Sequence, residues 1–217
     1  MKQPDVHQAD IDRQSAALTA DLPEGEPLDS MTETMIGLGI RASAMSLDVD
    51  GTREYIERAL CGGATSAQVQ EVITLVSGTG VHSFFEATRI LDLLVTEPDG
   101  PPWDNERQRL WDMYVGDGGY WTTMQDEIPG FLAALNRMSP EAFEAFFLYC
   151  AVPWRLHNLT DLTKELISVA VDATPSHRYL PGMRLHLRNA IKLGAGRSAL
   201  EHTLRIAAAG PTPKGVL

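Results

Sequence analysis

Hydrophobic residues recur along this chain at the spacing of amphipathic helices. Val69, Val72, Ile73 and Val76 follow one another at i, i+3, i+4 and i+7, so they share one face of a predicted helix. Similar patterns predict helices over residues 30–46, 52–63, 82–94, 105–116, 124–138, 140–152, 159–173 and 197–209, and another that begins near Pro181. No segment shows the strict alternation and hairpin turns of paired strands. The chain is therefore predicted to be all-α.

Several predicted helices carry signals that mark their ends. Ser30 with Glu33, and Thr65 with Gln68, match the capping box, in which each side chain bonds to the backbone N–H of the other residue. Residues 97–105 contain three prolines and one glycine, which predicts a loop between two helical regions.

Two segments of the chain resemble each other at a constant offset. Gly182 matches Gly51 (182 − 51 = 131), and His186 falls on Tyr55 at the same offset. Further matches at this offset are Arg184/Arg53, Thr163/Thr32, Ile167/Ile36, Ala173/Ala42, Ala190/Ala59, Gly194/Gly63 and Ala195/Ala64. A constant offset across three successive predicted helices indicates an internal duplication in which only the second segment keeps the histidine.

Composition and charge narrow the range of partners. Of the 217 residues 44% are hydrophobic, and the formal net charge is −11. Such a charge repels phosphate backbones and anionic lipid heads, so we expect no nucleic acid and no membrane as a partner. Residues 1–28 are polar and acidic, and they are predicted to form an N-terminal arm without the apolar stretch of a secretory signal. The two cysteines are too few for a disulfide framework, and a cytoplasmic location is the default expectation.

Three stretches carry a pattern that is typical of one helical family. They are ERALCGGATSAQVQEVITLVSGTGVHS at 57–83, KELISVAVDA at 164–173, and HLRNAIKLGA at 186–195 with its H-x-x-x-A-x-x-x-G-A spacing. These stretches resemble the carboxymuconolactone decarboxylase family. That family shares its all-helical fold with the alkyl hydroperoxide reductase D-type peroxidases, so the resemblance implies this fold for the chain.

The resemblance also implies the domain organisation. A degenerate first repeat spans 29–96, a second repeat spans 139–217, and residues 97–138 form a linker with connecting helices. Single-repeat relatives assemble through their helices into rings, so we expect a homo-oligomer, either a dimer or a trimer.

The cysteine pair of the peroxidase branch is missing from this chain. That branch uses E-x-x-C-x-x-C-x-x-x-H, and projection back from His186 places the two cysteines at Tyr179 and Gly182. Dithiol chemistry needs two sulfur atoms close enough to form one bond. Cys61 and Cys150 lie outside this motif, so a residual thiol activity is only a minor alternative.

Four residues are the candidates for catalysis: His186, His177, His82 and Glu165. His186 matches the family histidine and is predicted to act as a general acid or base at the start of a helix, whose positive end would lower its pKa. A pocket formed between the repeats could combine it with His177 and His82. Glu165 would orient an imidazole and raise its pKa. The alternatives are ordinary capping, turn or surface roles for the same side chains.

Three further residues are candidates for substrate binding. Arg184 could hold a carboxylate through two hydrogen bonds, although a structural ion pair is the alternative. Tyr179 and Trp154 could line an aromatic-friendly pocket. Three imidazoles could also suit zinc or iron, but no short ligand spacing supports this, so no metal and no organic cofactor is expected.

These features together predict a cofactor-independent lyase or isomerase of the carboxymuconolactone decarboxylase type. The resemblance implies a small-molecule carboxylate substrate, a lactone or enol-type compound. His186 would donate a proton while His177 or His82 polarises the adjacent oxygen. The alternative is a non-catalytic ligand-binding or assembly protein, which the altered first repeat and the missing cysteines would favour.

Overall fold

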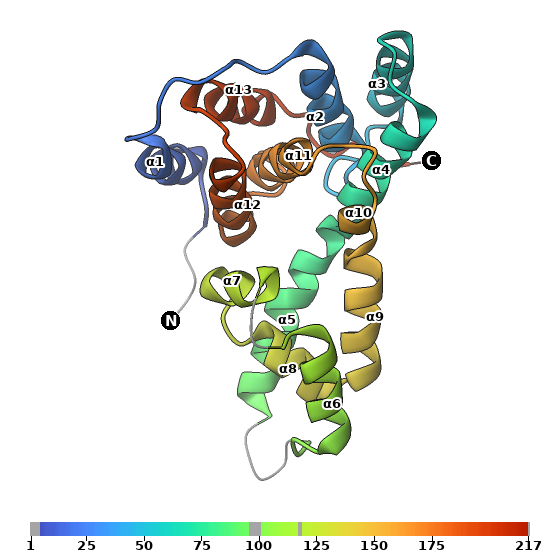
Figure 1. Ribbon diagram of the computed structural model, residues 1–217, viewed down its shortest axis with the longest axis vertical. Coiled ribbons are helices and arrows are strands. Elements are labelled where there is room, and N and C mark those ends of the chain that lie inside the picture. Colours follow the sequence, from blue (N-terminus) through green and yellow to red (C-terminus); the bar gives the residue numbers. More distant parts are fainter. Residues whose placement is uncertain (1–4, 96–100, 117–118, 217) are drawn as a thin grey trace. The chain divides into compact units, whose positions relative to one another are not determined.

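The computed structural model describes residues 5–95, 101–116 and 119–216, and these residues form helices and connecting turns without any strand (Figure 1). The prediction of an all-α fold is thereby confirmed. Contacts divide the chain into two compact units, one made of Met1–Thr79 with Pro153–Leu217 and the other of Gly80–Val152. Within the described residues, no helix combines the length and the apolar character needed to cross a bilayer.

The first unit is built around two helices that are buried on nearly all sides. Its helices are α1 (Gln8–Thr19), α2 (Ser30–Ala42), α3 (Val49–Cys61), α4 (Ser66–Ser77), α11 (Asp161–Ala173), α12 (Leu180–Lys192) and α13 (Arg197–Ala208). α2 packs against α11, while α3 and α4 flank α2, and α12 and α13 flank α11. Because neighbours surround α2 and α11, polar residues on them are buried as well as apolar ones.

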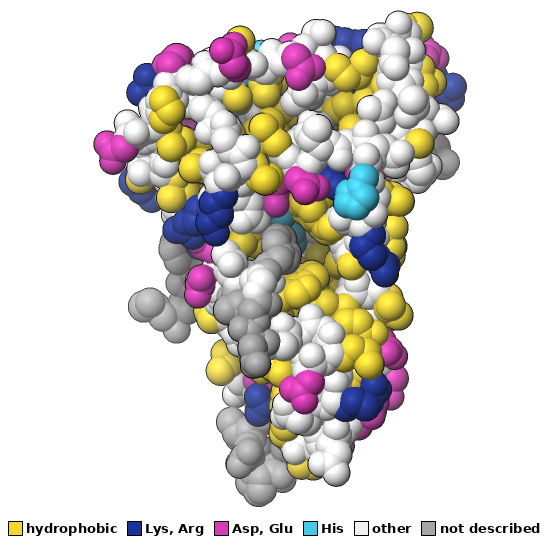
Figure 2. Space-filling model, viewed as in Figure 1, with side chains coloured by type: hydrophobic (Ala, Val, Ile, Leu, Met, Phe, Trp, Pro, Cys, Tyr) yellow, Lys and Arg dark blue, Asp and Glu magenta, His cyan; other side chains and the backbone are white. Residues whose placement is uncertain are grey.

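The second unit has an aromatic core. It contains α5 (Val81–Leu94), α6 (Asn105–Tyr114), α7 (Tyr120–Glu127), α8 (Phe131–Met138) and α9 (Pro140–Cys150), and the short helices η1 (Gly78–Gly80) and α10 (Val152–Arg155) adjoin it. The rings of Phe85, Phe131 and Phe146 contact one another, with the Phe131 centroid 4.3 Å and 5.4 Å from those of Phe85 and Phe146. Some large apolar side chains stay exposed, and Figure 2 shows hydrophobic side chains on the visible face of α9.

The capping signals were predicted correctly at one helix and wrongly at another. Thr65 and Gln68 form the expected capping box at the start of α4. At α2, however, the N-cap is Asp29, whose carboxylate accepts hydrogen bonds from the backbone N–H groups of Met31 and Thr32. Ser30 is already the first helical residue, because an ionised carboxylate one position earlier satisfies the free N–H groups of the first turn.

The offset of 131 residues that relates the two similar segments also relates their helices. α11, α12 and α13 begin and end 131 residues after α2, α3 and α4. The backbone agrees as well, since Leu47 and Arg178 have φ of 45° and 50°, and Gly63 and Gly194 have φ of 97° and 98°. A common origin of the two segments stays a prediction, and these matching bounds are what supports it.

The N-terminal segment contains a packed helix, which the sequence pattern did not reveal. α1 contacts α12 and α13, and its Ile11 side chain is 1% exposed. The chain after α1 is also held, because the backbone N–H groups of Arg197 and Ser198 donate to the carbonyl oxygens of Pro23 and Glu24. This polar helix has only two large apolar residues, Ile11 and Leu18, so its amphipathic signal is weak and an arm was predicted instead.

We expect Ile11→Ala to lower the free energy of unfolding by about 2–5 kcal/mol, because it leaves a cavity beneath α1. Chemical denaturation measures this change. Leu60→Ala is the control, since Leu60 is 45% exposed and its truncation should cost less than about 0.5 kcal/mol. Equal stabilities for the two variants would mean that residues 8–19 behave in solution as the loose arm that the sequence suggested.

Candidate functional site

The candidate site lies where α12 packs along α11 in the first unit. Both helices are connected by the short turn at residues 174–179, so side chains on their facing surfaces come into contact. Four predicted site residues belong to this region: Glu165 on α11, His177 and Tyr179 in the turn, and His186 on α12. Trp154 joins them from α10, which ends shortly before α11 begins.

Glu165 and His186 form a short, buried pair. The distance from His186 Nδ1 to Glu165 Oε2 is 2.6 Å, and the two side chains are 13% and 5% exposed. The second carboxylate oxygen of Glu165 accepts a hydrogen bond from Asn189 Nδ2 at 3.1 Å. Because both oxygens are engaged, the carboxylate is fixed, and it holds the Nδ1–H tautomer of His186 so that Nε2 is the nitrogen left for chemistry.

The electrostatics of His186 differ from the prediction. The residue lies at mid-helix in α12 and not at the helix start, so the positive end of the helix does not lower its pKa. Burial of the ring opposes protonation, but the charge of Glu165, its hydrogen bond and the charge of Asp172 together raise the pKa of His186 above the ordinary value of 6.5. The protonated form of His186 is therefore favoured more than that of a free imidazole, which suits this residue to proton donation.

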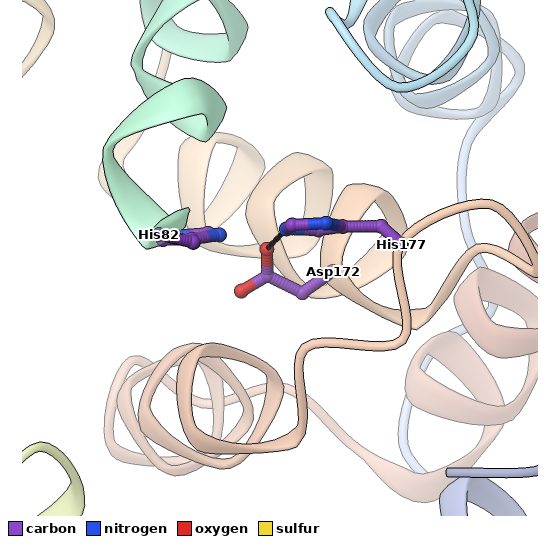
Figure 3. A group of neighbouring side chains, drawn as sticks. All are labelled: His82, Asp172 and His177. Atoms are coloured by element: carbon purple, nitrogen blue, oxygen red, sulfur yellow. Dashed lines mark ion pairs between the residues drawn. The ribbon is translucent and has the colours of Figure 1, made fainter. Parts of the chain in front are cut away.

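His177 has a carboxylate of its own. His177 Nε2 lies 3.5 Å from Asp172 Oδ1, and the dashed line in Figure 3 marks this ion pair. The two side chains are 9% and 2% exposed. On the other side, the His177 ring stacks on that of Tyr179 with a centroid distance of 5.8 Å. His177 is therefore a buried, oriented imidazole and not the solvent-facing turn residue that was its alternative reading.

The two carboxylates lie on one face of α11. Glu165 and Asp172 are seven residues apart, which corresponds to two helical turns and roughly 10 Å along the axis. Glu165 is paired with His186, and Asp172 is paired with His177. The charge of Asp172 also acts on His186 and helps to raise its pKa. The meeting of the two imidazoles in one pocket stays a prediction, and the contacts show one carboxylate–imidazole pair at each of two positions on α11.

Trp154 lies against His186. The two rings are nearly parallel, with an interplanar angle of 8° and a centroid distance of 6.4 Å. Arg184, in contrast, is engaged elsewhere, since its Nη1 donates to Gln14 Oε1 on α1 at 2.7 Å. Binding of a substrate carboxylate by Arg184 stays a prediction, and its hydrogen bond to Gln14 connects α12 with α1.

His82 belongs to the other unit. It lies in the first turn of α5, and its ring centroid is 5.5 Å from that of Phe85. Its contribution to a composite site therefore stays a prediction.

Two residues of the site were missed by sequence reasoning. Asp172 and Asn189 stand at helical spacing from the predicted residues, i+7 from Glu165 and i+3 from His186. This spacing on a shared face was the available signal. Asp172 offers a carboxylate oxygen and His177 an imidazole nitrogen as possible metal ligands. Two ligands are only part of a metal site, so we derive no metal chemistry from them.

The first repeat has a different arrangement at the matching positions. Tyr55 stands at the position of His186, and the Arg41 guanidinium, at the position of Asp172, lies 4.1 Å from the Tyr55 ring centroid. Thr34 replaces Glu165, and its hydroxyl donates to the Ser30 carbonyl oxygen. A cation–π contact therefore occupies this place, with no carboxylate–imidazole pair at these positions.

The cysteines do not favour thiol chemistry. Burial raises the pKa of Cys150 to about 12, so its thiolate is scarce near neutral pH. Tyr179 and Gly182 stand where the peroxidase branch has its cysteines. A Cβ atom added at Gly182 would collide with Asp172 Oδ2 and lie 2.9 Å from Tyr179 Cδ1, so the site is packed around a glycine.

Comparison with known proteins gives one solved structure that resembles the whole chain. It is a crystal structure from Burkholderia xenovorans LB400, provisionally named a gamma-carboxymuconolactone decarboxylase subunit. The TM-score is 0.70 and the sequence identity 28%, over 94% of this chain and 91% of that chain. No family model and no curated protein sequence matches the chain.

We expect Glu165→Gln to lower the pKa of His186, because the amide keeps the shape of the carboxylate but not its charge, so burial then dominates. NMR titration of the imidazole measures this shift. Since the folded-state pKa is raised, the contribution of His186 to the free energy of unfolding is complete below pH 6.5 and is lost as pH rises through the folded-state value. The stability difference between the native protein and the variant should shrink over that window, and a difference independent of pH would contradict the pairing.

Proposed function

We propose that this chain is a member of the carboxymuconolactone decarboxylase family and a cofactor-independent lyase acting on a small carboxylated lactone or enol-type compound. The observation that carries the proposal is the buried pair of His186 and Glu165, with its 2.6 Å contact and raised imidazole pKa. A buried, charged imidazole with one nitrogen fixed is a suitable general acid.

The proposed reaction is a decarboxylation followed by a proton transfer. The bond between the ring carbon and the carboxylate breaks, carbon dioxide leaves, and the electron pair is delocalised into the conjugated carbonyl group. His186 then donates the proton on Nε2 to a carbon of the delocalised anion, and solvent returns a proton to the imidazole. Glu165 supports this step because its charge stabilises the imidazolium before transfer and its bond to Nδ1 keeps the ring in place.

His177 would act on the oxygen that receives the electron density. One ring nitrogen of His177 faces Asp172, and the other would donate a hydrogen bond to the carbonyl oxygen of the substrate. Trp154 and Tyr179, whose rings stack on the two histidines, would form apolar walls for the unsaturated ring. An isomerisation would use the same acid and the same oxygen-binding group, with a proton removed in place of carbon dioxide.

We expect His186→Gln to reduce the rate of carbon dioxide release by about 10²–10⁴-fold, the usual contribution of a general acid. The assay uses gamma-carboxymuconolactone and related carboxylated lactones, and in D₂O the product should carry one deuterium at a carbon of the delocalised anion. His202→Gln is the matched control, because His202 lies on α13 and has no place in the proposed site. Full activity of the His186 variant would refute the proposal, and a native protein inactive on every lactone would favour a ligand-binding role.

Replacement of both cysteines tests the thiol alternative. We expect Cys61→Ser with Cys150→Ala to leave lactone decarboxylation unchanged, since the proposed chemistry uses imidazole and carboxylate groups only. Peroxide reduction should be equally low before and after the change. An activity that disappears with the two thiols would identify a redox function in place of the proposed one.

A further inference from the structure

A second charged cluster lies next to the candidate site and is completely buried. The side chains of Lys164 on α11 and Glu71 on α4 are both 0% exposed, and Lys164 Nζ lies 3.5 Å from Glu71 Oε1. Removing two charges from water is costly, and replacement of such a pair by apolar residues is often neutral or stabilising. A pair of this kind is therefore better explained by what it positions than by the stability it adds.

Lys164 Nζ also lies 2.9 Å from the carboxylate of the exposed Asp161, and the other partners of the pair come from one stretch of chain. Lys164 Nζ donates to the carbonyl oxygens of Leu156 at 3.0 Å and Pro153 at 3.3 Å. Glu71 Oε2 accepts from both the backbone N–H and the side-chain amide of Asn158, at 2.9 Å and 2.8 Å. The lysine and the glutamate thus fasten residues 153–158 at several points to two helices of the first unit.

This stretch carries the indole that faces the proposed acid. Trp154 follows directly after Pro153, whose carbonyl oxygen Lys164 binds, and its ring is parallel to that of His186. Lys164 Nζ itself lies 5.6 Å from the centroid of the Trp154 ring. The indole is consequently held at its backbone and by a contact with its π-face, and it is presented to the imidazole in one orientation.

We propose that Lys164 and Glu71 are positioning residues that hold Trp154 against His186 and thereby keep the imidazole aligned for proton transfer. The inference rests on the proposed function of His186. It adds that the proton donor is supported from two sides: Glu165 fixes Nδ1, and the fastened indole restricts the plane of the ring. Loosening the stretch would leave His186 with its carboxylate partner but free to tilt.

Tryptophan fluorescence tests the proposal without a substrate. A protonated imidazole quenches an indole that it contacts, so emission should show a pH-dependent step that disappears in both Trp154→Phe and His186→Gln. We expect the apolar double variant Lys164→Met, Glu71→Met to fold and to lose this step, with kcat for decarboxylation reduced on the order of tenfold to a hundredfold. Arg197→Met with Glu24→Met, an exposed pair in the same unit, is the matched control and should keep the step.

The possible outcomes separate this inference from the proposed function. A double variant that folds and retains the native step would overturn the positioning role, even if His186→Gln is inactive. A lost step in the double variant supports the positioning role, even if no lactone is turned over. Should the double variant not fold, Asn158→Ala decides the question, because it removes one bond between Glu71 and the stretch while keeping the ion pair. A weaker step then supports the proposal, and an unchanged step refutes it.

Discussion

The contact of the buried His186 imidazole with the Glu165 carboxylate is the interaction on which the site depends. An isolated charge in such surroundings would lose its proton, because burial disfavours the ionised form. In this chain the negative charges of Glu165 and Asp172 outweigh that penalty at His186. Both acids are positions of α11, which is itself surrounded by α2, α4, α12 and α13. The central helix therefore serves at once as the core of the unit and as the support for its chemistry.

The two similar segments carry opposite charges at matching positions of the same backbone pattern. Where the second repeat has Asp172 and His186, the first has Arg41 and Tyr55, so an acid with a basic ring is replaced by a base with an aromatic ring. The matching backbone positions therefore accept both arrangements, and of the two only the one with Glu165 and His186 pairs a carboxylate with an imidazole.

The sequence predicted helices well because helical periodicity is a local property. The strongly amphipathic α4 and its capping box were found from Val69 and its neighbours, whereas α1 was missed because only Ile11 among its large residues is fully buried. The pairing of Glu165 with an imidazole was also predicted, through resemblance to a family. Asp172, Lys164 and Glu71 were not, because their roles arise from contacts between helices. A buried lysine and an exposed one are identical in a sequence, and only packing distinguishes them.

The close packing of Asp172 against Gly182 limits which catalytic side chains can stand together at this site. The position is one where thiol-based members of the fold carry a cysteine, yet here the space beside it is filled by the carboxylate that partners His177. A sulfur-bearing residue could enter only if Asp172 moved or was lost. The Asp172–His177 pair and a cysteine at position 182 therefore need the same space, so one excludes the other. A chain could pass from one to the other only through several concerted substitutions, so specialisation at this position is difficult to reverse.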